Sequence, residues 1–118
     1  MLFRSVVPIN VNKGNKMKFT HDANINGTSF RGSVVTTYAE LVQVFGLPDE
    51  GPDDLDADKV TCCWRLEFED GTVASIYDWK TPSTPYGKYE WHIGGKTSTA
   101  VDHVLETFYA VQIGRAHV

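Results

Sequence analysis

The stretch "KVTCCWRLEFEDGTVASIYDWK", residues 59–80, decides the fold, because Asp70-Gly71 joins two runs in which apolar and polar residues alternate. An Asp-Gly pair between such runs is the strongest short signal of a β-hairpin. A two-residue turn at this pair predicts that Trp64 faces Tyr77 across the hairpin. The predicted core face carries Cys62, Trp64, Leu66, Phe68, Val73, Ser75, Tyr77 and Trp79. The other face is predicted to be a mixed polar surface of Thr61, Cys63, Arg65, Glu67, Ala74, Ile76, Asp78 and Lys80.

A further strand is predicted over residues 88–94, "KYEWHIG", where the alternation resumes. Its apolar residues, Tyr89, Trp91 and Ile93, would join the core face. His92 would then lie on the polar face, beside Arg65 if this strand pairs with the hairpin. A weak strand or two is predicted between residues 18 and 35, where two glycines bracket short β-prone runs.

Two helices are predicted, each beginning at a threonine with an acidic residue three positions later. Thr37 and Glu40 have capping-box spacing, and Gly46 ends the short apolar-faced helix that follows. The same spacing at residues 99–102 precedes an apolar stripe of Val101, Val104, Leu105 and Phe108. The pattern predicts an α+β fold: an antiparallel β-sheet with a central Asp-Gly hairpin, one short helix between strands and a C-terminal helix packed on one face.

We expect one domain over residues 17–112. The final "IGRAHV" back-translates to a common sequencing adapter, so we expect residues 113–118 to be read-through sequence. Residues 13–17 can be encoded by a ribosome-binding sequence ahead of a start codon, which predicts either upstream translation of residues 1–16 or an edge strand there. A domain this small is near the lower limit for a self-sufficient core, which favours a homo-oligomer.

Acidic residues dominate the expected domain. The whole chain has a formal net charge of −4, but residues 17–112 hold all fifteen acidic residues and seven Lys or Arg, a net charge of −8. Duplex nucleic acid is bound mainly by Lys and Arg that neutralise phosphates, so this balance argues against such a partner. The segment 49–58, "DEGPDDLDAD", is predicted to be a solvated loop, and it lacks the ligand order of an EF-hand.

The cysteines and histidines give no metal-binding pattern. Cys62 and Cys63 are adjacent, so on a strand they point to opposite faces, and free thiols in a reducing compartment are expected. The four histidines, at positions 21, 92, 103 and 117, share no metal-type spacing with them. We predict no metal and no cofactor. The chain also contains no apolar run long enough to span a bilayer and no signal-peptide pattern, which favours a cytoplasmic protein.

The stretch "WHIGGKTST", residues 91–99, matches only part of a phosphate-binding loop. Gly95-Lys96-Thr97 has the expected ending, but Glu90 stands where the first glycine should be. Two glycines beside a helix start and a lysine still suit an anion, because backbone N–H groups can converge there. The alternative is that Gly94 and Gly95 only turn the chain.

The sequence offers little for catalysis. His92 with Glu90 or Asp78 has the composition of an acid and base pair, but a histidine on a polar strand face is more often a hydrogen-bonded surface residue. Cys63 has no identified base, and no serine lies in a nucleophile elbow. We predict no enzyme. Tyr86, in a proline-containing loop, is the aromatic residue expected outside the core, where it would stack on a base or line an interface.

The runs "TTYAELVQVFGLP", "KVTCCWRLEFEDGTVASIYDWK" and "YEWHIGGK", within residues 36–96, resemble small uncharacterised proteins encoded by bacteriophages and other large DNA viruses. In size the chain resembles the sponges that sequester nucleotide immune signals of Thoeris or CBASS systems. The resemblance implies a phage-encoded anti-defence oligomer in the cytoplasm of the infected bacterial host. Such a protein would bind a cyclic nucleotide or a cyclic ADP-ribose-type signal without cleaving it.

Ligands of this kind require backbone amides, cations and an aromatic platform. The residues that would supply them are Gly94, Gly95, Lys96, Thr97, Arg65, His92 and Tyr86. Two alternatives remain open. One is an acidic protein-binding inhibitor that mimics nucleic acid, led by Asp53, Asp54, Asp56 and Asp58, and the other is a virion or packaging accessory protein.

Overall fold

The computed structural model describes residues 18–21, 23–51, 60–81 and 83–116. Within them the chain forms one antiparallel sheet and two helices, so the predicted α+β class is confirmed. The elements in chain order are β1 (Phe19–Thr20), β2 (Ser29–Thr36), α2 (Tyr38–Phe45), β3 (Cys63–Phe68), β4 (Val73–Tyr77), β5 (Tyr89–Gly95) and α3 (Thr99–Ala116).

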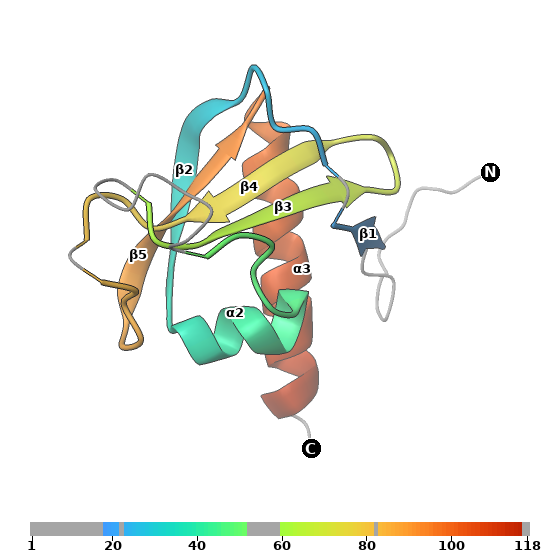
Figure 1. Ribbon diagram of the computed structural model, residues 1–118. Coiled ribbons are helices and arrows are strands. Elements are labelled where there is room, and N and C mark those ends of the chain that lie inside the picture. Colours follow the sequence, from blue (N-terminus) through green and yellow to red (C-terminus); the bar gives the residue numbers. More distant parts are fainter. Residues whose placement is uncertain (1–17, 22, 52–59, 82, 117–118) are drawn as a thin grey trace.

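The sheet has five strands in the order β1-β3-β4-β5-β2, and every neighbouring pair is antiparallel. The hairpin β3–β4 lies at its centre, as the Asp-Gly signal predicts, and β5 pairs with β4 (Figure 1). The early strand β2 pairs with the late strand β5, so it lies at one edge of the sheet. β1 and β2 are consecutive in the chain but form opposite edges of the sheet, because the segment between them crosses from one edge to the other.

The turn of the central hairpin differs from the predicted two-residue turn. The Gly71 N–H donates to the Phe68 carbonyl oxygen at 2.8 Å, and the Phe68 N–H donates to the Thr72 carbonyl oxygen at 2.8 Å. Three residues therefore form the loop, with Gly71 at a φ of 90° in the left-handed region. The extra residue shifts the register by one, so that Trp64 faces Ile76 and the predicted pairing with Tyr77 was wrong.

A one-residue shift moves every side chain of β4 to the opposite face. Ala74 and Ile76 are fully buried in the core, although both were predicted on the polar face. Val73 and Tyr77, predicted in the core, lie on the other face with Ser75. Trp79, predicted to face Cys62 in the core, is 40% exposed instead. The predicted core residues on β3 and β5, by contrast, are correct.

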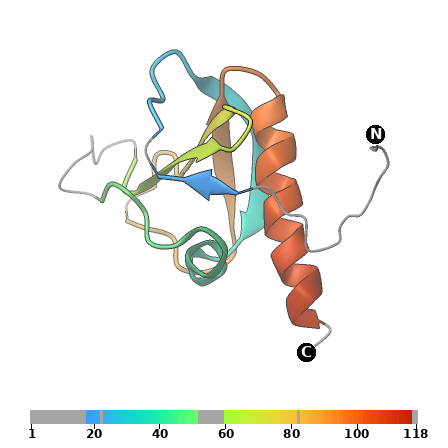
Figure 2. The same ribbon diagram turned by 90° about the vertical axis from the view of Figure 1, so that its right-hand side faces the viewer.

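The C-terminal helix α3 covers one face of the sheet, as predicted (Figure 2). Its buried apolar residues, Ala100, Val104 and Phe108, share one stripe. The helix lies close to the sheet at Gly95, where an added Cβ would stand 2.4 Å from the Ala100 Cβ atom. Glycine at that position is therefore a packing requirement.

The short helix α2 lies below the sheet in the view of Figure 1, at one end of the core. It begins and ends where the sequence predicts. The Glu40 N–H donates to the Thr37 hydroxyl at 3.2 Å, and Gly46 ends the helix at a φ of 87°. Leu41 and Phe45 are buried. The Trp64 indole N–H donates to the Gly46 carbonyl oxygen at 2.8 Å, which attaches the helix end to the central hairpin.

Candidate functional site

The face of the sheet opposite α3, here called the open face, carries the candidate site. Strand alternation and register place two rows of residues on it. The first row is Arg65, Ser75 and Gly94, and the second is Cys63, Tyr77, His92 and Ser33. Each row crosses three or more strands, so residues distant in sequence become neighbours only through the register.

A cavity of about 230 Å³ lies on the open face. Strands contribute its floor, and the segments before β2 and before β3 contribute its walls. The residues that line it are Ile25, Thr28, Ser29, Glu50, Val60, Cys63, Ser75, Tyr77 and Gly94. Most of this surface is apolar, with a few hydroxyl groups and one carboxylate, which is the composition typical of a small-molecule site.

Gly94 helps to form the cavity floor because it has no side chain. A Cβ atom at this position would stand 2.6 Å from the Ser75 hydroxyl oxygen and 3.4 Å from a ring carbon of Tyr77. The β3–β4 register places Ser75 and Tyr77 on the open face, so the unpredicted turn creates this part of the site. Sequence reasoning missed both residues because it assumed the two-residue turn.

Burial keeps two acidic groups of the cavity protonated. Burial and, to a smaller extent, the neighbouring Glu50 carboxylate raise the pKa of the Cys63 thiol to about 12. Burial also raises the pKa of Tyr77, with a smaller contribution from Cys63. At neutral pH Cys63 is therefore a neutral thiol rather than a nucleophilic thiolate, and Tyr77 is a neutral phenol.

An aromatic cluster surrounds His92 beside the cavity. The ring centroids of Phe30 and Tyr77 lie 4.8 and 5.5 Å from that of His92. The Trp79 ring lies 6.4 Å away and is inclined to His92 by only 23°. Phe30 is 56% exposed, so this cluster presents ring surface to solvent.

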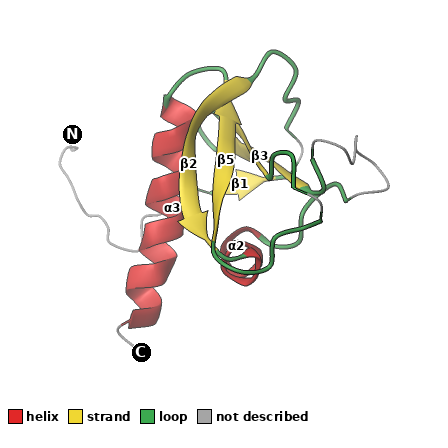
Figure 3. Cartoon of the chain, turned by 90° about the vertical axis from the view of Figure 1, so that its left-hand side faces the viewer, coloured by secondary structure: helices red, strands yellow, loops and turns green. Residues whose placement is uncertain are grey.

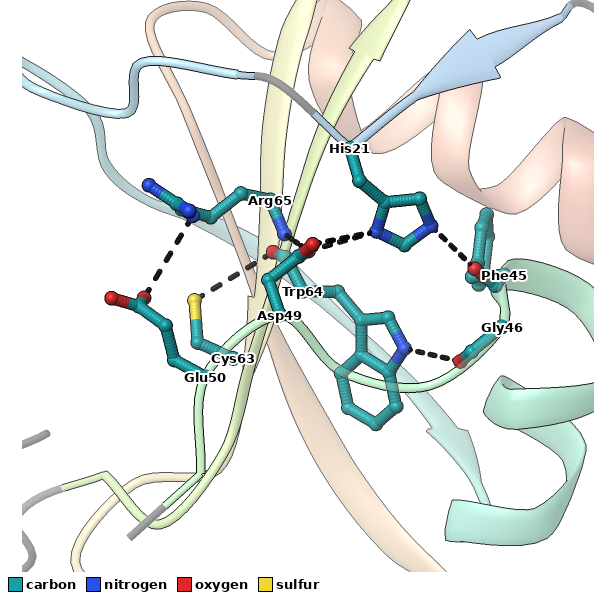
Figure 4. A network of polar contacts seen from close by, with 8 residues as sticks. All are labelled: His21, Phe45, Gly46, Asp49, Glu50, Cys63, Trp64 and Arg65. Carbon is teal, nitrogen blue, oxygen red and sulfur yellow. Dashed lines mark hydrogen bonds and ion pairs between the residues drawn. The ribbon is translucent and has the colours of Figure 1, made fainter. Parts of the chain in front are cut away.

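A polar network holds the loop after α2 against β3 (Figure 4). The Asp49 carboxylate accepts a hydrogen bond from the Arg65 backbone N–H at 2.7 Å and lies 2.9 Å from His21 Nδ1. His21 Nε2 lies 2.7 Å from the Phe45 carbonyl oxygen, so a single imidazole joins the residue after β1 to the end of α2. Asp49 was predicted to lie in a solvated loop, and that prediction was wrong because its carboxylate satisfies a strand N–H.

Glu50 follows Asp49 in the loop after α2 and forms part of the cavity wall. It forms an isolated β-bridge with Cys63, with hydrogen bonds of 3.2 and 3.0 Å between their backbones. Its carboxylate lies 3.9 Å from the Arg65 Nε atom, which places one cation beside the cavity. Arg65 was predicted from the hairpin pattern, whereas nothing in the local sequence singles out Glu50.

The predicted phosphate loop has a different conformation. Gly94 and Gly95 belong to β5, where Gly94 pairs with Ser75 on one side and with Phe30 on the other. Their backbone groups therefore form part of the sheet, and the expectation that they turn the chain was wrong. The lack of a side chain leaves room for the cavity at Gly94 and for α3 at Gly95.

Lys96 and Thr97 follow the strand at the start of α3, and both are exposed. The Thr97 hydroxyl accepts a hydrogen bond from the Thr99 N–H at 3.3 Å, as a helix-start residue does. The Arg31 guanidinium donates to the carbonyl oxygens of Gly95 and Lys96 at 3.0 and 2.8 Å. The carbonyl oxygens of this turn therefore bind the Arg31 guanidinium, whereas the predicted phosphate loop required backbone N–H groups that face an anion.

The remaining predicted site residues separate into two places. Arg65, His92 and Gly94 share the open face, although β4 lies between Arg65 and the strand that carries His92. Tyr86 lies elsewhere, with its ring centroid 5.0 Å from that of Tyr38 in α2. The structure therefore brings together part of the predicted set around the cavity and leaves Tyr86 outside it.

Asp78 was predicted on the polar face as a candidate partner of His92, but its carboxylate is fully buried. It accepts hydrogen bonds from the Thr61 N–H at 2.7 Å and from the Cys62 N–H at 3.2 Å. The hydroxyl groups of Thr61 and Thr81 donate to it as well. The shifted hairpin register explains this position, and the bonds explain how a buried carboxylate is stabilised.

A second cavity of about 400 Å³ borders β1 and is lined by Lys18, Phe19, Thr20, Glu67, Phe68 and Glu69. None of the predicted site residues lines it. Among the described residues, no group of three or more His, Cys, Asp or Glu side chains has the arrangement of a metal site. The acidic residues Asp53, Asp54, Asp56 and Asp58 lie outside the described residues.

No family model, no curated protein and no solved structure matches the chain. Neither helix in the described part of the chain has the length and apolarity needed to cross a membrane.

Proposed function

We propose that this protein is a phage-encoded anti-defence protein that binds a nucleotide immune signal on its open face and sequesters it without cleavage. The observation that carries the proposal is the cavity of about 230 Å³ between the sheet and the segments that contribute Glu50 and Ile25. It is concave, mostly apolar and edged by hydroxyl groups, which suits a flat heterocyclic base.

The volume indicates how such a ligand would lie. Sites that enclose a whole drug-sized molecule have volumes of about 300–1,000 Å³. A cavity of about 230 Å³ suits one base of a cyclic nucleotide or cyclic ADP-ribose-type signal, with the sugar and phosphate groups at its mouth. Arg65 is the cation beside that mouth, and it would exchange its contact with Glu50 for a phosphate.

The protonation states favour binding over reaction. A thiol whose pKa is about 12 does not attack a phosphate or a glycosidic carbon at neutral pH. The hydroxyl of Ser75 lies on the cavity floor, and its neighbours on the same row, Arg65 and Gly94, are not general bases. The carboxylate that lines the cavity, Glu50, lies 3.9 Å from the Arg65 Nε atom, and we propose that it is paired with this cation rather than acting as a base. Bound ligand would therefore leave unchanged, which is the property that sequestration requires.

The test is thermal unfolding of the full chain against cyclic dinucleotides, cyclic trinucleotides and cyclic ADP-ribose isomers. Ligand at one hundred times its Kd stabilises the native state by about 2.7 kcal/mol, so a tight ligand gives a clear shift. Heat denaturation should then release the ligand intact, as chromatography would establish. A complete lack of stabilisation across the panel would refute the proposal.

Variants locate the site. Ser75→Leu would extend a larger side chain into the cavity and should abolish the ligand-induced shift, and Arg65→Ala should weaken it by removing the phosphate partner. Glu106→Gln changes an exposed residue on α3, away from the open face, and serves as the control. Full binding by Ser75→Leu, with a native circular dichroism spectrum, would exclude this cavity.

A further inference from the structure

The outer edge of β2 has no partner strand among the described residues. β2 runs over residues 29–36 and, within the described chain, pairs only with β5. Figure 3 looks onto this side of the molecule, where β2 lies in front of β5 and α3 lies beside them. Alternate N–H and C=O groups of an edge strand point away from the sheet, which makes such an edge a template for another strand.

The second half of β2 lacks the devices that usually protect an edge. Natural edges carry charged side chains, proline or a bulge. A register shift lies between Phe30 and Gly32, but residues 32–36, "GSVVT", contain neither a charge nor a proline. Three of these five residues, Val34, Val35 and Thr36, are β-branched, which favours an extended strand.

Three charged side chains near this stretch have hydrogen-bond partners within the chain, and one of them is Glu40, whose carboxylate accepts a hydrogen bond from the Thr36 hydroxyl at 2.6 Å. The Arg31 guanidinium turns back to donate to the carbonyl oxygens of Gly95 and Lys96. The Glu90 carboxylate accepts a hydrogen bond from the Ser33 hydroxyl at 2.8 Å. Because these hydrogen bonds engage the charged groups within the chain, their charges do not protect the edge at residues 32–36 from another strand.

Exposed apolar side chains accompany this edge. Val35 is 58% exposed and Phe30 is 56% exposed, and both lie on the open face of β2. Single exposed apolar residues are common on protein surfaces. Here two of them flank an unpaired edge, where a further strand would bury part of their surface.

We propose that the β2 edge pairs with the β2 edge of a second copy of this chain. A two-fold axis makes such an edge complementary to itself, because unpaired donors of each strand meet unpaired acceptors of the other. Charge does not oppose this occupant at the contact itself. Two chains that each carry a formal net charge of −4 repel, and residues 32–36 provide an uncharged surface on which they can meet. The result is a continuous sheet with five strands from each copy.

The proposal is tested by size-exclusion chromatography with light scattering on the full chain over a range of concentrations. The expected mass is twice that of the 13.2 kDa chain. Val35→Lys places like charges across the two-fold axis and should yield a monomer. Leu47→Lys, which also puts a lysine at an exposed apolar position but outside β2, should leave the dimer unchanged.

A monomeric wild-type chain would overturn the proposal, as would a dimer that survives Val35→Lys. Should Val35→Lys fail to fold, Ser33→Lys tests the same edge, and hydrogen exchange of the wild type tests it without substitution. The amides of residues 32–36 should exchange at least tenfold more slowly at a protein concentration that gives the dimer mass than at one that gives the monomer mass. Equal exchange at both concentrations would exclude pairing at β2.

Discussion

At the scale of single residues, the buried carboxylate of Asp78 connects the chain on both sides of the central hairpin. It accepts hydrogen bonds from the backbone N–H groups of Thr61 and Cys62, seventeen and sixteen positions away. The sequence predicts a polar surface residue here, because nothing nearby in the chain indicates that these donors need a partner. Only the folded arrangement brings donors and acceptor together.

We expect Asp78→Ala to lower the free energy of unfolding by at least about 2 kcal/mol, because a buried group left without a partner costs about 1–3 kcal/mol and two N–H groups lose theirs. Asp78→Asn keeps one carbonyl acceptor and should cost less. Urea denaturation followed by circular dichroism measures both changes. A loss below about 0.5 kcal/mol for the alanine variant would show that water replaces the carboxylate.

Asp70 predicts how stability depends on pH. The hydrogen bond from His103, at 2.7 Å, and then the Thr72 N–H lower the pKa of Asp70 from 3.8 to about 2. Because the folded-state pKa is below the unfolded value, this stabilisation is full above about pH 4 and is lost as the pH falls through about 2. The stability difference between wild type and Asp70→Asn should therefore shrink from pH 5 to pH 2.

The measurement is urea denaturation at half-unit pH steps, with Glu106→Gln as the control for loss of an exposed carboxylate. That control should show no comparable change across the same range, since Glu106 is an exposed residue of α3 and its substitution leaves the contact between Asp70 and His103 intact. A constant difference between wild type and Asp70→Asn would mean that the contact with His103 does not discriminate between the two protonation states.

At the scale of elements, the β3–β4 hairpin shows the limit of a turn signal. The Asp-Gly pair predicts a hairpin, and the hairpin is present. It does not distinguish a two-residue loop from a three-residue loop, because glycine satisfies the left-handed position of either. The three-residue loop is the one that places Ala74 and Ile76 in the core with α3. Tertiary packing therefore selects the register.

We expect Gly71→Ala to destabilise the protein by about 1–2 kcal/mol, because a residue with a Cβ atom is strained at a φ of 90°. Gly87→Ala is the matched control, since its backbone φ is outside the left-handed region and an added Cβ meets no atom within 4 Å. The control should be neutral or slightly stabilising. Equal effects of the two substitutions in chemical denaturation would contradict the strained-turn assignment.

At the scale of the whole molecule, pairing through β2 predicts that stability depends on protein concentration. A dimer that dissociates on unfolding gains about 1.4 kcal/mol of association free energy for each tenfold rise in concentration. The Tm of the wild type should therefore rise over a hundredfold concentration range, while the Tm of Val35→Lys should remain constant. Calorimetry at several concentrations measures this, and a wild-type Tm that does not change would contradict the dimer.

The sequence by itself determined the features that depend on near neighbours: the Thr37 cap, the Gly46 helix end, the apolar stripe of α3 and the presence of the central hairpin. It also placed Arg65 and His92 on the same face of the sheet, which is the open face. Only the tertiary structure decided the hairpin register, the burial of Asp78 and the cavity. The physical reason is that these features depend on strands whose partners are distant in the chain, such as β2 with β5, and on which register lets α3 pack.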